Sequence, residues 1–194
     1  MGRDWQSPAG NFYGSTLVRL AAGDPPAATL ALVAAVALHQ TLSALAPELQ
    51  LWIKWPNDIL CQGAKMSGIL LEREGDAVII GIGVNLAFHP EGLGRPVTSL
   101  LAQGAPALSP DEFQTRLAAA LDDFLVLWRG QGLAPIRREW LARAHPYGTP
   151  LSVVGSAGEA LAGSFDGLAE DGALNLRLAD GSVRAIHAGD VFLI

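Results

Sequence analysis

Two lysines are the first residues of this chain that could do chemistry. The sequence has 13 lysine and arginine residues, and only Lys54 and Lys65 are lysines. A lysine ammonium is compact, rotates freely and changes its pKa readily, whereas an arginine guanidinium is a planar fork with a fixed charge. A site that must follow a moving phosphate or carboxylate oxygen would favour lysine. Two surface lysines that escaped a general preference for arginine explain the composition equally well.

A rigid turn directly follows the first lysine. Residues 55–58, Trp-Pro-Asn-Asp, place an amide and a carboxylate beside Lys54. Asn and Asp often serve only as turn residues, because they bond their own backbone. In the functional interpretation, Asp58 holds a cation or an amine, and Asn57 bonds a ligand. The turn therefore extends the candidate site from two cations to a mixed cluster.

A Gly-Ile-Gly-Val-Asn stretch ends an apolar run at residues 81–85. Glycine weakens a strand unless something must approach its backbone closely, so Gly81 and Gly83 indicate room for a ligand. Asn85 could read the edge of a base through its amide. A bulge followed by an Asn turn is the alternative. No helix is expected to follow, which argues against a dinucleotide-binding layout.

The N-terminus holds two further candidates. Arg3 and Trp5 could clamp a phosphate and stack on a ring. A disordered terminus is the plain alternative. The four histidines lack metal-ligand spacing, and Cys61, the only cysteine, is expected to be a buried apolar residue.

The elements that must position these residues can be read from apolar periodicity and turn residues. The 77–86 run is almost continuously apolar, which predicts a central strand covered on both faces. After residue 148, short strands and tight turns predict a small barrel that docks against the first part of the chain. Strands are expected over 11–20, 49–54, 59–61, 65–73 and 77–86, and helices over 26–46, 109–128 and 135–144.

Charge and composition exclude several classes of protein. The net charge is −6, and no basic stripe is present, which argues against a nucleic-acid partner. A single cysteine allows no internal disulfide and suits a reducing cytosol. The longest apolar stretch, residues 30–38, is too short to cross a membrane, and the N-terminus is no signal peptide. A cytoplasmic protein without a membrane anchor is expected.

The order of the motifs resembles the biotin protein ligases. The matching pieces are GR-x-W-x-SP-x-GN-x-Y-x-S at 2–15, KWPND at 54–58, K-x-x-GIL-x-E at 65–72 and GIG-x-N at 81–85. The tail resembles the small C-terminal barrel of the same family. The resemblance implies an α+β fold: a mixed sheet backed by helices over residues 1–146, and an SH3-like barrel over residues 147–194.

The resemblance also implies a two-step reaction. Biotin and ATP, with Mg²⁺, would form biotinyl-AMP and pyrophosphate. A lysine of a biotin carboxyl carrier domain would then attack the adenylate and release AMP. A lipoate or octanoate ligase of the same fold is one alternative, and a non-catalytic remnant that binds an adenylate or a carrier is another.

Residue roles follow from the resemblance position by position. Lys65 would be the central cation at the α-phosphate and the biotin carboxylate, and Asp58 would orient the carrier lysine or assist the metal. Lys54 and Asn57 would support the phosphate region, and Asn85 would bond adenine. The other implied ligand-binding residues are Trp5 at the adenine site, Ile69 as apolar lining, and Arg3, Gly68, Gly81, Gly83 and Val84.

In the family the pattern continues upstream of Gly2, with a GRGRRGR stretch that closes over the adenylate. The sequence is therefore expected to lack its N-terminal part, through a misassigned start, a segment supplied by another chain, or degradation of the gene. An uncovered sheet edge would leave apolar surface and unpaired backbone, so either oligomerisation, for example as a homodimer, or instability is expected. No helix-turn-helix precedes the site, and a repressor role is not expected.

Overall fold

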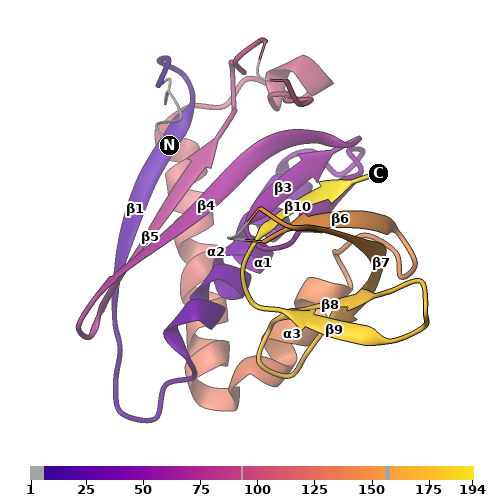
Figure 1. Ribbon diagram of the computed structural model, residues 1–194. Helices are drawn as coiled ribbons and strands as arrows, with labels where there is room; N and C mark the ends of the chain where they lie inside the picture. Colours follow the sequence, from indigo (N-terminus) through magenta and orange to yellow (C-terminus); the bar gives the residue numbers. More distant parts are fainter. Residues whose placement is uncertain (1–6, 93, 156–157) are drawn as a thin grey trace.

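A five-stranded antiparallel sheet organises the first part of the protein (Figure 1). The computed structural model describes residues 7–92, 94–155 and 158–194. The sheet order is β1-β5-β4-β3-β2. Its strands are β1 (Phe12–Arg19), β2 (Leu51–Lys54), β3 (Asp58–Cys61), β4 (Ala64–Glu74) and β5 (Ala77–Val84).

The α+β class is confirmed, but the strands of this sheet pair antiparallel, so the expectation of a mixed sheet is corrected. The reason lies in the connections, since tight turns link β2 to β3, β3 to β4 and β4 to β5, and a tight turn can only join antiparallel neighbours. Parallel pairing in the described part of the chain is limited to two isolated bridges, Ile53–Ala144 and Lys65–Val97.

Helices cover one face of this sheet, behind it in Figure 1. The short helix η1 (Ala27–Thr29) leads into α1 (Leu30–Leu45), and η2 (Leu101–Gln103) precedes α2 (Pro110–Gln131) and α3 (Leu133–Leu141). The predicted start of α2 is confirmed, because Ser109 and Glu112 cap each other's backbone and Pro110 occupies the first turn.

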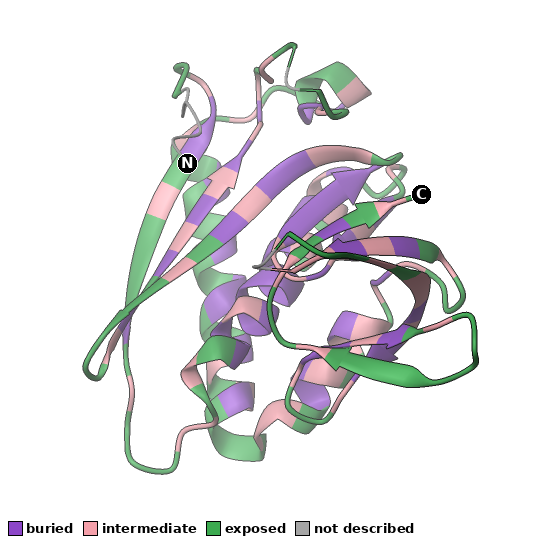
Figure 2. Ribbon diagram, in the orientation of Figure 1, coloured by how far each residue is buried: buried purple, intermediate pink, exposed green. Residues whose placement is uncertain are grey.

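The helix α1 is the centre of the core. Residues 33–38 are fully buried in it (Figure 2). The segment Ala27–Leu45 is long and apolar enough to cross a membrane by length and composition, which the shorter apolar stretch in the sequence did not suggest. Its burial among the sheet, α2 and α3 accounts for that composition, because a helix that is apolar all round needs cover on all sides.

The strand β5 differs from its prediction. Its even-numbered residues are buried, whereas Ile79 on the other side is 41% exposed. Within the part of the chain that the structure describes, only one face of β5 is therefore covered. The opposite side of β1, β5 and β4 is called the open face below; it also carries Leu17 and Leu70, which are 57% and 61% exposed. An apolar run alone could not distinguish one covered face from two.

The tail forms a second five-stranded antiparallel sheet, which curls on itself (Figure 1). It docks on the first part, as predicted: the Trp55 indole donates to the Gly172 carbonyl at 3.2 Å, and Arg137 donates to the Leu168 carbonyl at 2.8 Å. The boundary at residues 146/147 remains a proposal. The order is β10-β6-β7-β8-β9, with β6 (Pro150–Val154), β7 (Ala160–Leu168), β8 (Leu174–Arg177), β9 (Val183–Ile186) and β10 (Asp190–Leu193).

Candidate active site

Both lysines of the chain meet at one carboxylate. Lys65 forms an ion pair with Asp58 Oδ1, and Lys54 Nζ lies 3.2 Å from Asp58 Oδ2. The sheet brings them together, because Lys54 pairs directly with Asp58 across β2 and β3, and β4 lies next to β3. The turn between Lys54 and Asp58 contains a cis Trp55–Pro56 peptide bond. The predicted cluster is thus assembled by three neighbouring strands.

The cluster has an excess of positive charge. Asp58 is only 5% exposed, and its single negative charge is shared by two ammonium groups. Burial lowers the pKa of Lys65, while the charge and hydrogen bond of Asp58 oppose this effect. Arg95 and Lys54 lower the pKa of Lys65 further through charge repulsion. An anion that replaces lost water around Lys65 would therefore be stabilised.

Glycines form the floor next to this cluster. Gly68 pairs with Gly83, and Gly81 pairs with Leu70, so all three glycines lie on the open face. A Cβ atom on Gly68 would lie 3.0 Å from Lys65 Nζ. The absence of side chains therefore leaves room for the lysine ends and lets a ligand approach the backbone.

The two predicted ligand amides both hold the protein backbone. Asn57 Nδ2 donates to the Ile69 carbonyl at 2.7 Å, and Asn85 Nδ2 donates to the Thr98 carbonyl at 2.9 Å. In each case the Oδ1 atom accepts no hydrogen bond from the part of the chain that the structure describes. Each side chain can thus fix a loop with its amino group and still offer one acceptor.

Two predicted ligand-binding side chains lie in the core instead. Ile69 is 3% exposed and Val84 is fully buried, because both alternate to the helix-covered face. The Ile69 side chain thus points away from the open face, where either residue could meet a ligand only through its main chain, and a role for Ile69 as apolar lining stays a prediction. The exposed apolar side chain of β4 on the open face is Leu70. Counting every second residue of β4 from Gly68 identifies Leu70, because alternate residues of a strand lie on the same face.

Arg3 and Trp5 lie outside the described residues. Arg95 was missed by sequence reasoning, because no motif surrounds it. It belongs to a segment that pairs with the start of β4, where the Lys65 amide donates to the Pro96 carbonyl at 3.0 Å. Only the tertiary structure links this arginine to Lys65.

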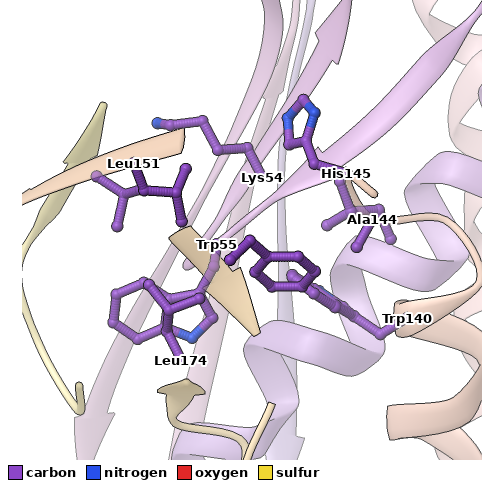
Figure 3. A pocket seen from close by; sticks show the side chains of 10 residues that line it. Lys54, Trp55, Trp140, Ala144, His145, Leu151 and Leu174 are labelled. Atoms are coloured by element: carbon purple, nitrogen blue, oxygen red, sulfur yellow. The ribbon is translucent and has the colours of Figure 1, made fainter. Parts of the chain in front are cut away.

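A second feature near Lys54 is a cavity between the two sheets (Figure 3). Trp55, Trp140, Leu151 and Leu174 line it. Figure 3 shows the Lys54 ammonium directed away from the two tryptophan rings. Its volume is about 10 Å³, room for about one water molecule. The cavity is therefore part of the docking surface between the sheets and too small for a substrate.

Comparison with known proteins identifies the family. A biotin–[acetyl-CoA-carboxylase] ligase of Paracoccus denitrificans is 42% identical over 202 residues, which cover 98% of this chain and 83% of that protein. The chain belongs to the biotin protein ligases. Within the present chain, the model of the Biotin/lipoate A/B protein ligase family matches residues 1–85, and the model of the Biotin protein ligase C terminal domain matches residues 153–194.

More distant relatives agree with this family. The bifunctional ligase/repressor BirA of Escherichia coli is 30% identical; the match covers 99% of this chain and 61% of BirA. The structure of the biotin protein ligase from Aquifex aeolicus in complex with biotin and ATP superposes with a TM-score of 0.86, covers 100% of this chain and 83% of that chain, and is 23% identical. The latter likeness supports the fold of this ligase.

Proposed function

We propose that this ligase activates biotin with ATP and transfers it to a lysine of a biotin carboxyl carrier domain. In the first step, a biotin carboxylate oxygen bonds to the α-phosphorus, and pyrophosphate leaves with the electron pair of the broken bond. In the second step, a lysine amine of the carrier attacks the acyl carbon, loses a proton and forms an amide, while AMP leaves.

The observation that carries this proposal is the Lys65–Asp58–Lys54 cluster beside the glycine floor. The first step brings two anions together, so it needs preorganised cations at the reacting oxygens. Lys65 is the side chain best suited to this task, because it is partly desolvated and lies next to open backbone. The glycine floor supplies the space in which biotin and the phosphate can lie.

The structure favours a positioning role for Asp58. Both of its oxygens are engaged by lysines. A carrier lysine that reached Asp58 would have to displace Lys54 from Oδ2. We therefore propose that Asp58 holds Lys54 and Lys65 at the reacting carboxylate and phosphate, and that any contact to the carrier lysine follows an exchange of partners.

Magnesium is proposed as part of the MgATP substrate. Among the described residues, no group of three or more His, Cys, Asp or Glu side chains could hold a metal ion. Asp58 is occupied by two cations and is a poor metal ligand in this state. The phosphates of ATP are thus the proposed ligands of the metal.

The relatives support the choice of substrates. One is named for acetyl-CoA carboxylase, and another was solved with biotin and ATP. We extend these properties to this chain: biotin and ATP as substrates, and a carrier domain of a carboxylase as partner. A location in the cytoplasm and assembly as a homodimer remain predictions.

The test uses the full chain with MgATP, a carrier domain, and either biotin or lipoate. Biotinyl-AMP is followed by chromatography, and transfer by the mass of the carrier. A carrier whose target lysine is replaced by arginine is the control. We expect biotin transfer to the intact carrier. Transfer of lipoate but not biotin, or adenylate binding without transfer, would contradict the proposal.

A further inference from the structure

The segment around Arg95 is tied to the candidate site through main-chain hydrogen bonds. The Lys65 amide donates to the Pro96 carbonyl at 3.0 Å, and the Thr98 amide donates to the Lys65 carbonyl at 2.9 Å. Residues 96–98 therefore lie as a short parallel partner beside the start of β4. Arg95 directly precedes this paired segment, so its Cα is held close to the backbone of Lys65.

Side-chain hydrogen bonds also hold the segment at residues 96–98 in place. Asn85 donates to the Thr98 carbonyl at 2.9 Å, and Gln103 donates to the Thr98 hydroxyl at 2.8 Å. Thr98 and Ser99 are buried. Pro96 removes one backbone freedom right after the arginine. The main chain at Arg95 is thus fixed at its C-terminal end, although the side chain itself is exposed.

The guanidinium of Arg95 adds uncompensated charge to the site. It forms no ion pair with the described residues, and its charge contributes to the lowered pKa of Lys65. Asp58 already neutralises one of the two lysines, so Lys54, Asp58 and Lys65 together carry one net positive charge. That charge is too small to balance a triphosphate, and within residues 7–92, 94–155 and 158–194 Arg95 is the further cation whose charge acts on Lys65.

We propose that Arg95 binds the β- and γ-phosphates of ATP and the pyrophosphate that leaves in the first step. This inference rests on the proposed ligase function. A guanidinium presents two parallel N–H donors to phosphate oxygens, which suits a leaving group that gains charge as the bond to the α-phosphorus breaks. Lys65 then serves the α-phosphate and the carboxylate, and Arg95 serves the phosphates that depart.

The proposed role of Arg95 affects only the first of the two half-reactions. Biotinyl-AMP has no β- or γ-phosphate, so Arg95 has no anion to bind in the second step. A loss confined to the first step is therefore the signature of this role. A general defect of folding or of the Lys65 region would slow both steps.

The experiment uses the full-length chain and its Arg95→Ala and Arg95→Lys variants, with Arg116→Ala as a control at an exposed position of α2. Pyrophosphate–ATP exchange with biotin gives KM for MgATP and the rate of the first step. A single-turnover reaction with preformed biotinyl-AMP and carrier gives the rate of the second. Thermal unfolding of each variant checks that the fold is retained.

For Arg95→Ala we expect KM for MgATP to rise about tenfold or more, because a charge-assisted hydrogen bond is lost. Transfer from biotinyl-AMP should stay within about twofold of the unchanged chain, and Arg95→Lys should recover part of the loss. An unchanged KM for MgATP, or equal slowing of both steps, would overturn the role of Arg95 but would leave the proposed function standing. An unchanged chain that makes no biotinyl-AMP would contradict the proposed function as well.

Discussion

The two faces of β4 and β5 use alternate residues of the same strands for different purposes. The helix-covered face is filled with branched apolar side chains, including Ile69, Ile80 and Val84. The open face is stripped to backbone at Gly68, Gly81 and Gly83, beside the lysine cluster. One face therefore supplies the hydrophobic free energy of folding, and the other supplies space and charge for a ligand.

The largest effect on the free energy of unfolding should come from a cavity on the helix-covered face. Ile80 is fully buried, and its neighbour Ile79 points to the open face with 41% exposure. Ile80→Ala should lower the free energy of unfolding by about 2–5 kcal/mol, because it removes buried methyl groups and leaves a cavity. Ile79→Ala, the matched control, should cost about 0.5 kcal/mol or less. Urea denaturation measures both, and equal losses would refute the distinction between the faces.

Among changes on the open face, removal of Lys65 should have the largest effect on the rate of the first step. Lys65→Ala should slow biotinyl-AMP formation by about 100- to 1000-fold, or about 3 kcal/mol in the barrier, because a preorganised charge at the reacting oxygens is lost. The melting temperature should change little, because Asp58 keeps Lys54 as an ion-pair partner when Lys65 is removed. Pyrophosphate exchange gives the rate; a loss below tenfold would assign the central role elsewhere.

A methyl group on the glycine floor tests the space for a ligand directly. In Gly81→Ala the new Cβ would lie 3.7 Å from the Leu70 carbonyl oxygen, an ordinary contact, so the fold should tolerate it. Biotin affinity should fall about tenfold, or about 1.4 kcal/mol, through steric overlap. Calorimetry with biotin measures it. Gly130→Ala in α2, where a Cβ meets open space, is the control and should leave biotin affinity unchanged.

The smallest effect concerns two histidines beside β2. Burial lowers the pKa of His39, which bonds the Leu51 carbonyl, and of His145, which stacks on Trp52. The unfolded chain therefore binds more protons as the pH falls below about 6.5, so the folded state loses stability there. The loss is at most about 1.4 kcal/mol per pH unit and histidine.

His145→Gln should remove part of that loss while leaving stability near pH 8 within about 1 kcal/mol. Denaturation by urea at pH 7.5 and pH 5.5 gives the comparison. An identical change in stability for the variant and the unchanged chain would show that His145 contributes nothing to the acid response.

Much of the fold followed from local signals. The strands around residues 12–19 and 51–61, the helix after Ser109 and the docked tail appear as predicted, because capping residues, tight turns and apolar periodicity act within a few residues of each other. The misjudged elements depend on contacts across the sheet. The cover of β5 and its pairing with β1 needed neighbours that no short window contains.

The sequence by itself determined which residue types the site contains. The only two lysines of the chain, a Trp-Pro-Asn-Asp turn and spaced glycines indicated Lys65, Asp58 and the glycine floor as candidates. Only the tertiary structure decided that Asp58 joins both lysines, that Ile69 and Val84 turn into the core, and that Arg95 comes close to Lys65. The physical reason is that strand pairing and side-chain alternation set which residues meet, and pairing partners lie far apart along the chain.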